Sequence, residues 1–217
     1  MSELSLVIGN KNYSSWSLRP WLLLKHFDID FEEIRVALYT AETHENLAKY
    51  SPSLKVPVLI HNERVIWDSL AICEYISESY LSHRGWPKSA DARAIARSVS
   101  AEMHSGFFAL RNELPMNCRK QLLDFDLSTD VLSEVQRIKA IWRECRERFG
   151  SDGEWLCGEF SIADCMFAPV VIRFHGYGIL LEGELKAYAE RVLSHPDVAI
   201  WMKEGAEESE VIEIAEV

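Results

Sequence analysis

Two adjacent serines stand where an apolar run gives way to a helical pattern. The segment NYSSWSLRPW places Ser14 and Ser15 between the run LSLVIG at 4–9 and an amphipathic pattern that starts at Ser17. A helix N-terminus presents free N–H groups and about half a positive charge, so it stabilises an anion, and a hydroxyl adds one more donor. The ordinary role of a serine here is to cap the helix. No GxSxG elbow surrounds the pair, which disfavours a hydrolase nucleophile.

A proline opens the strand pattern KVPVL at 55–59. Proline cannot donate to a sheet ladder, so Pro57 belongs at a strand end or on a sheet edge. A cis bond before it would leave the Val56 backbone free to pair with an extended peptide, as in strand addition. A trans proline that merely starts a strand is the plainer alternative.

The segment DSLA at 68–71 has the residue types that bind an α-amino acid. A helix N-terminus with exposed amides binds a carboxylate, and Asp68 beside it would suit an ammonium group. Simple capping by Asp68 or Ser69 explains either residue alone. A second capping arrangement, SIAD at 161–164, has Asp where a capping box has Glu, and it predicts only the start of a buried helix.

The elements that hold these residues follow the order β-α-β-α-β-β-α over the first 80 residues. A strand pair bridged by a helix implies a parallel pair with a right-handed crossover, and the closing hairpin adds antiparallel strands. We therefore expect an α/β sheet of about four strands. The predicted strands are 4–9, 31–37, 56–60 and 64–67, and the predicted helices are 17–27, 43–50 and 68–81.

The second part of the chain is helical by pattern. The composition of SHRGWPKS at 82–89 is that of a linker, and it separates a domain at 1–81 from an all-helical domain at 90–203. The predicted helices of this domain are 90–114, 129–150, 160–178, 183–193 and 196–204. The tail at 204–217 carries six acidic residues and no basic one, which is typical of a solvated, disordered end. Its alternating EVIEIAEV could instead dock as a strand, and both alternatives stay open.

Composition excludes several classes of protein. The net charge of −11 offers no basic face to nucleic acid. No apolar run approaches the roughly 20 residues of a membrane span, and the first ten residues lack a signal peptide pattern, so we expect a cytoplasmic protein. Five cysteines without a CxxC disfavour a disulfide framework and a zinc site, and no metal is expected.

Taken in order, SSWSLR, KVPVLIHN, DSLAICEYISE and SIADCMFAP resemble the cytosolic glutathione transferase superfamily, over residues 4 to 203. The resemblance implies an α/β thioredoxin-like N-terminal domain followed by an all-α helical C-terminal domain. It implies a cytoplasmic homodimeric detoxification enzyme that uses glutathione as co-substrate, without a metal and without nucleic-acid or membrane partners.

SSWSLR is similar to the SPFSLR of the tau class and the SSCSWR of the zeta class, which implies that Ser14 is the catalytic serine and Ser15 a secondary candidate. Its hydroxyl would face the glutathione sulfur. The remaining glutathione-binding residues implied by the resemblance are Lys55 for the glycine carboxylate, Val56 and a cis Pro57 for the cysteinyl backbone, and Asp68 and Ser69 for the γ-glutamyl end.

The resemblance also implies a pocket for the electrophile between the two domains. Its candidate wall is formed by Tyr13, His104, Phe107, Phe108 and Arg111. A phenylalanine pair at that spacing is also typical of a helix core, and this alternative stays open.

Three functions are compatible with these residues. The first is conjugation of a small hydrophobic electrophile to a glutathione thiolate. The second is maleylacetoacetate isomerisation, in which glutathione returns unchanged; the zeta class that performs it has Cys where this chain has Trp16 and commonly Gln where it has Asp68. The third is a non-enzymatic binding protein on the same scaffold.

Overall fold

The computed structural model describes residues 3–123 and 125–216. Its first part is a small mixed sheet in the order β2-β1-β3-β4, which confirms the predicted parallel pair and hairpin. Strand β1 (Leu4–Ile8) runs parallel to β2 (Glu32–Arg35) and antiparallel to β3 (Val58–His61), and β3 continues antiparallel into β4 (Arg64–Trp67).

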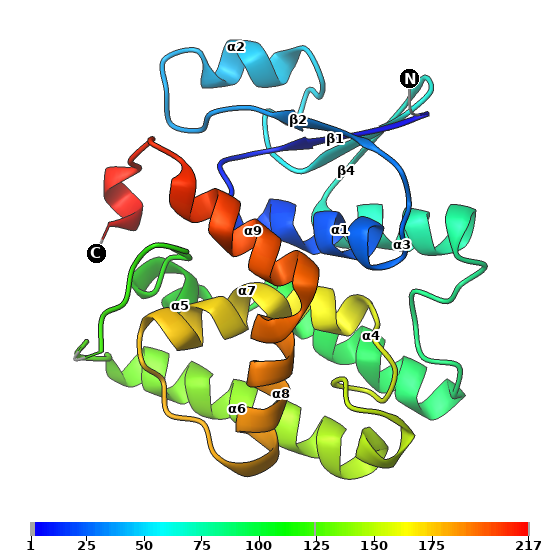
Figure 1. Cartoon of the computed structure of the whole chain (residues 1–217), viewed down its shortest axis with the longest axis vertical. Coiled ribbons are helices and arrows are strands. Elements are labelled where there is room, and N and C mark those ends of the chain that lie inside the picture. Colours follow the sequence, from blue (N-terminus) through cyan, green and yellow to red (C-terminus); the bar gives the residue numbers. More distant parts are fainter. Residues whose placement is uncertain (1–2, 124, 217) are drawn as a thin grey trace.

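Helices cover both faces of the sheet (Figure 1). Helices α1 (Ser15–His26) and α3 (Ser69–Tyr80) lie on the face toward the second domain, and α2 (Thr43–Ala48) lies on the other. A hydrophobic core lies on each face of the sheet, and because side chains alternate along a strand, β1 contributes side chains to both cores. Leu6 and Ile8 join the large core, whereas Val7 packs with Val58 and Leu47 beneath α2.

The second part contains the helices α4 (Ala90–Ser105), α5 (Phe108–Glu113), α6 (Thr129–Phe149), α7 (Ile162–Gly176), α8 (Gly183–Ser194) and α9 (Pro196–Glu207), with short 3₁₀ turns at Gly150–Asp152 and Glu213–Ala215. Helix α7 is buried nearly all round and packs against α1, α4 and α8. The predicted capping box starts it: Asp164 accepts from Ser161 N at 2.8 Å and from Leu156 N at 2.9 Å. Along the described chain, no helix combines the length and apolar character that crossing a membrane requires.

Two expectations about the second part are wrong. The single helix expected at 90–114 is broken after Ser105, because Gly106 is extended and Phe107 adopts a left-handed φ of 61°. Over its described residues, 204–216, the tail forms no strand, and it packs against the protein although side chains such as Val211 and Ile214 remain exposed. Helix α9 continues to Glu207, and residues 208–216 fold back against the first domain, where the red segment of Figure 1 passes close to the start of α1.

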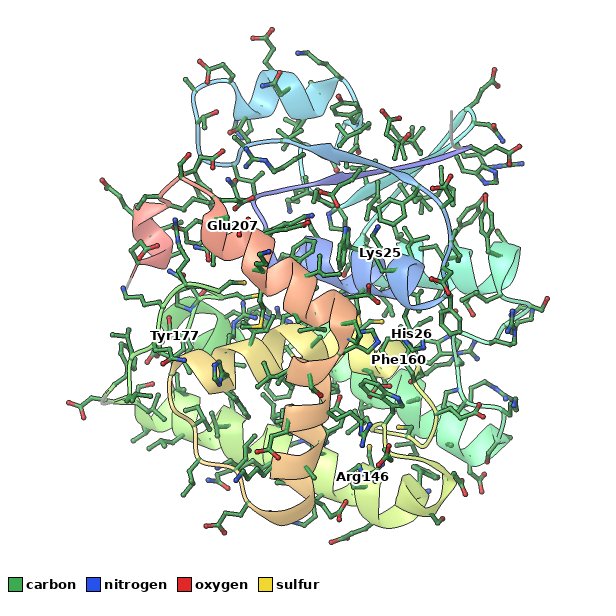
Figure 2. All side chains as sticks on the ribbon, in the orientation of Figure 1. Lys25, His26, Arg146, Phe160, Tyr177 and Glu207 are labelled. Atoms are coloured by element: carbon green, nitrogen blue, oxygen red, sulfur yellow. The ribbon has the colours of Figure 1, made fainter. Side chains whose placement is uncertain are left out.

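An aromatic cluster joins the end of α1 to the second domain. His26 stacks on Phe160 with ring centroids 3.6 Å apart, and its Nδ1 lies 2.9 Å from Nε2 of His195, between α8 and α9. Figure 2 shows His26 and Phe160 side by side. Burial, followed by the proximity of His195, lowers the pKa of His26 to about 4, so the cluster is neutral at neutral pH.

Candidate active site

The turn between β1 and α1 presents the two serines in different directions. Ser14 is the N-cap residue of α1, but its side chain makes no capping hydrogen bond, so the capping interpretation is wrong for this hydroxyl. Ser14 Oγ instead donates to Ser17 Oγ at 2.8 Å, and Ser17 Oγ accepts from Gly9 N at 3.1 Å. Ser15 Oγ accepts from Arg173 Nη2 of α7 at 3.3 Å. Ser15 therefore contacts the second domain, and Ser14 stays on the side of the sheet.

A cavity of about 700 Å³ lies between the loop before β3 and the start of α3. The Val56–Pro57 bond that borders it is cis. The structure thus brings together all five residues expected to hold glutathione. The lining consists of Trp16, Ser53, Lys55, Val56, Pro57, Trp67, Asp68 and Ser69.

Asp68 uses its two carboxylate oxygens differently. Oδ1 caps α3 by accepting from Leu70 N at 3.0 Å and Ala71 N at 3.1 Å, and Oδ2 lies 2.9 Å from His104 Nε2. Burial pushes the pKa of Asp68 upward, but the hydrogen bonds from His104 and from these two amides outweigh it, and its pKa falls below its ordinary value. Asp68 is consequently a carboxylate facing the cavity at neutral pH.

Arg19 lies behind the cavity wall, a position that sequence reasoning missed. Its guanidinium is fully buried, donates to Ser69 Oγ at 3.4 Å and lies 4.3 Å from the Trp16 ring centroid. Arg111 of α5 also approaches this ring, at 4.6 Å. Burial, followed by repulsion from Arg111 and Arg173, lowers the pKa of Arg19. Arginine nevertheless keeps its proton at neutral pH, so positive charge lies near the start of α3. The only sequence signal was the place of Arg19 three residues after Trp16.

The residues expected around the electrophile are not gathered in one place. His104 meets Asp68 and the edge of Trp16, and Arg111 lies over the same ring. Phe107 is buried in the core, whereas Phe108 is 67% exposed. The Tyr13 hydroxyl donates to Glu216 Oε1 at 2.5 Å and so faces the C-terminal segment.

A second cavity of about 600 Å³ shares Trp16, Lys55 and Val56 with the first. The rest of its wall comes from α2 and the loops beside it: Leu38, Tyr39, Thr40, Thr43, His44, Leu47 and Leu54. The sequence did not point to these residues because neither the short helix predicted at 43–50 nor the loops beside it carry a binding motif. A larger cleft of about 980 Å³ between α6 and the start of α8 contains none of the predicted site residues. Among residues 3–123 and 125–216, no group of three or more His, Cys, Asp or Glu side chains is placed to hold a metal ion.

Comparison with known proteins gives concordant matches in both parts of the chain. Residues 13–79 match the glutathione S-transferase N-terminal domain, and residues 105–202 match the glutathione S-transferase C-terminal domain. "Glutathione S-transferase 1" of Dianthus caryophyllus is 32% identical over 171 residues, 76% of this chain and 75% of that protein.

Two further comparisons bear on function and fold. A "Probable maleylacetoacetate isomerase" of Caenorhabditis elegans is 37% identical over 98 residues, which is 45% of each protein. The crystal structure of a glutathione transferase homolog from Burkholderia GL BGR1 with bound glutathione has a TM-score of 0.71 at 22% identity and covers 96% of this chain and 100% of that one. This likeness shows that the fold is shared.

Proposed function

The chain belongs to the glutathione S-transferase family, and from this premise we propose that it binds glutathione in the cavity beside Trp16 and uses the Ser14 hydroxyl to activate the thiol for attack on a small apolar electrophile. Ser15, whose hydroxyl contacts Arg173, is the secondary candidate for that role. We also propose that the protein acts as a cytoplasmic homodimer.

One observation carries this proposal: a single cavity combines partners for both charged ends and for the cysteinyl backbone of the tripeptide, and Ser14, assigned to the thiol, is not among its lining residues. Asp68 offers a carboxylate to the γ-glutamyl ammonium. Ser69, at the positive N-terminal end of α3, suits the γ-glutamyl carboxylate. Val56, before the cis Pro57, suits the cysteinyl backbone, and Lys55 suits the glycine carboxylate.

The thiol is activated by a rearrangement of two hydroxyl hydrogens. Ser17 keeps accepting from Gly9 N while its own hydrogen turns toward Ser14 Oγ, and this frees the Ser14 hydrogen for the sulfur. A free thiol has a pKa of about 8.5. A hydrogen bond to an anion contributes about 1.5–3 kcal/mol and a helix N-terminus about 0.3–1 kcal/mol. Since each pKa unit is worth about 1.4 kcal/mol, the thiol pKa falls by about one to three units.

The reaction that follows is a displacement or an addition. The thiol proton leaves to solvent and the thiolate sulfur forms a bond to the electrophilic carbon. In a displacement the leaving group departs with its electron pair; in an addition the electron pair of the broken π bond moves onto the substrate, which then takes up a proton from solvent. Ser14 forms no covalent bond at any stage. The second cavity, with its apolar Leu38 and Leu54, is where we place the electrophile. His104 and Arg111 remain candidates for the electrophile pocket because both contact the ring of Trp16, which lines this cavity. Tyr13, Phe107 and Phe108 remain candidates only because of the family resemblance.

The likeness to the probable isomerase of Caenorhabditis elegans supports a second candidate function, maleylacetoacetate isomerisation. In that reaction the thiolate adds to the substrate and leaves again after bond rotation, so no glutathione is consumed. Substrate turnover without loss of glutathione separates it from conjugation.

The proposed function is tested by conjugation of glutathione to a chloronitroaromatic electrophile. We expect Ser14→Ala to lower kcat/KM by about tenfold or more at pH 7, because one hydrogen bond to an anion is lost. Ser15→Ala is the comparison variant: retained activity in it assigns the role to Ser14, and a loss of activity in Ser15→Ala but not in Ser14→Ala would transfer the role to Ser15. Parent-like turnover by Ser14→Ala would remove the role assigned to that hydroxyl. Glutathione binding without turnover of this electrophile or of maleylacetoacetate would favour a non-enzymatic binding protein.

A further inference from the structure

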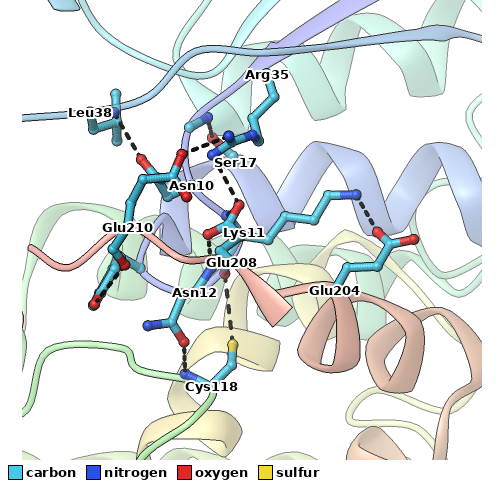
Figure 3. A network of polar contacts seen from close by, with 12 residues as sticks. Asn10, Lys11, Asn12, Ser17, Arg35, Leu38, Cys118, Glu204, Glu208 and Glu210 are labelled. Carbon is cyan, nitrogen blue, oxygen red and sulfur yellow. Dashed lines mark hydrogen bonds and ion pairs between the residues drawn. The ribbon is translucent and has the colours of Figure 1, made fainter. Parts of the chain in front are cut away.

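The turn that carries Ser14 is held from outside by the end of the chain (Figure 3). Glu208, just after α9, accepts from two consecutive backbone amides of this turn. Its Oε1 accepts from Lys11 N at 2.8 Å, and its Oε2 accepts from Asn12 N at 3.1 Å. The Glu208 side chain is only 9% exposed, and the turn itself is buried. Both carboxylate oxygens are therefore in use as acceptors.

Helix α9 packs directly onto the same turn. Trp201 Nε1 donates to the Lys11 carbonyl at 2.9 Å. At Gly205 the approach is so close that a Cβ atom would lie 2.9 Å from Asn12 N and 3.0 Å from the Lys11 carbonyl carbon. Only glycine fits there, because the atoms it would meet belong to backbone and cannot rotate away.

The charges of the segment also match the surface beneath it. Lys11 Nζ lies 2.5 Å from Glu204, and Arg35 Nη2 lies 2.7 Å from Glu210. Arg119 donates to the Glu208 carbonyl at 2.6 Å. The acidic composition that predicted a solvated tail thus serves to fasten the segment to basic side chains of both domains.

Ser14 is hydrogen-bonded to the same turn, so the position of the turn determines the position of Ser14. Ser14 N donates to the Asn10 carbonyl at 2.8 Å, and Tyr13 N donates to the same oxygen at 3.2 Å. On its other side, Asn12 Oδ1 accepts from Cys118 N at 2.8 Å. Without Glu208, the amides of Lys11 and Asn12 would be buried donors without acceptors, a situation that native structures avoid. The turn would have to shift to hydrate them, and Ser14 would shift with it.

We propose that Glu208 is a positioning residue that holds the Lys11–Asn12 turn, and through it the Ser14 hydroxyl, in the geometry that thiol activation needs. The inference rests on the function proposed for Ser14. Glu208 touches neither glutathione nor the electrophile in this scheme, and its effect reaches the thiol only through Ser14.

The test combines two readouts on the full chain. Hydrogen exchange of the Lys11 and Asn12 amides, without glutathione, reports on the turn alone. The pH profile of kcat for conjugation reports on the thiol. Glu208→Ala removes both acceptors and Glu208→Gln removes one, because an amide group has a single acceptor oxygen. Glu207→Gln, which removes an exposed charge one residue earlier, is the matched control.

We expect Glu208→Ala to speed exchange at both amides and to lower kcat at pH 7 by about tenfold, as small misplacements of a reacting group do. The loss should shrink at high pH, where the thiol ionises unaided, and Glu208→Gln should fall between this variant and the parent. The double variant Ser14→Ala with Glu208→Ala should have the same pH profile as Ser14→Ala alone. Glu207→Gln should match the parent.

Two results would overturn the inference while leaving the proposed function intact: unchanged amide exchange in Glu208→Ala, or a parent-like pH profile in that variant although Ser14→Ala shifts the profile. A loss of kcat in the double variant well beyond that of Ser14→Ala would also overturn it, because Glu208 would then act elsewhere. A Ser14→Ala variant with the parent profile would instead refute the proposed function, and the role of Glu208 with it. If Glu208→Ala does not fold, Glu208→Gln provides the same comparison.

Discussion

Asp68 provides a test of how the cavity recognises the γ-glutamyl end of glutathione. Asparagine is the informative replacement, because its Oδ1 can still cap α3 at Leu70 and Ala71 and because its side chain has nearly the size and shape of aspartate. We therefore expect Asp68→Asn to change the free energy of unfolding by less than about 1 kcal/mol, including the loss of the pair with His104.

The effect on binding is larger. A charge-assisted hydrogen bond contributes about 1.5–3 kcal/mol, and the lower end applies because the Asp68 side chain is 43% exposed. Glutathione should thus bind about tenfold more weakly to Asp68→Asn, since 1.4 kcal/mol corresponds to a factor of ten.

Calorimetric titration with S-methylglutathione, which has no ionisable thiol, isolates this contact. N-acetylation of the ligand removes its ammonium group, and the parent protein should then bind it about tenfold more weakly. Asp68→Asn should bind the acetylated and unacetylated ligands with equal affinity. Equal weakening of both ligands by the substitution would refute the reasoning, because the lost contact would then not involve the ammonium group.

Three further predictions concern stability and the hydroxyl pair. Asp164→Ala should lower the free energy of unfolding by about 2–4 kcal/mol in urea titrations, because a helix cap is lost and buried amides lose their acceptor; a loss below 1 kcal/mol would contradict this. Folding lowers the pKa of His26 to about 4, so the unfolded state binds more protons than the folded state between pH 6.5 and 4. The free energy of unfolding should therefore fall as the pH drops through this range, and His26→Gln should weaken this dependence. An unchanged pH dependence in His26→Gln would contradict this explanation. Ser17→Ala should cost about 1–3 kcal/mol of stability by leaving Gly9 N unpaired, and it should raise the pH at which kcat reaches half its maximum; an unchanged profile would speak against the relay of hydroxyl hydrogens.

The fold followed from the sequence where local patterns and chain connectivity agree. The apolar run at 4–9 and the helical pattern after it predicted the β1–α1 unit, and SIAD predicted the buried cap of α7. The family resemblance implied that Lys55, Pro57 and Asp68 bind one ligand, and in the structure they line one cavity. These features depend on residues close together in the chain, which is what a sequence pattern encodes.

The remaining features depend on contacts between distant residues. Capping propensity at Ser14 was overridden because Ser17 offers its hydroxyl a different acceptor. The helix break at Phe107 needs a left-handed φ that phenylalanine adopts only under tertiary constraint. The acidic tail looked solvated because its partners lie far away in the chain: Lys11 is 193 residues from Glu204, and Arg35 is 175 residues from Glu210. Arg19 was missed for the same reason, since its partner Ser69 comes from another helix.

The central claim is that Ser14 lowers the pKa of the glutathione thiol, and ultraviolet titration of the thiolate bound to the protein tests it most directly. We expect the bound thiol to ionise about one to three pH units below the free thiol and Ser14→Ala to return it most of the way to the free value, whereas Ser15→Ala should not. A bound thiol that ionises at the same pH in the parent and in Ser14→Ala would contradict this role of Ser14.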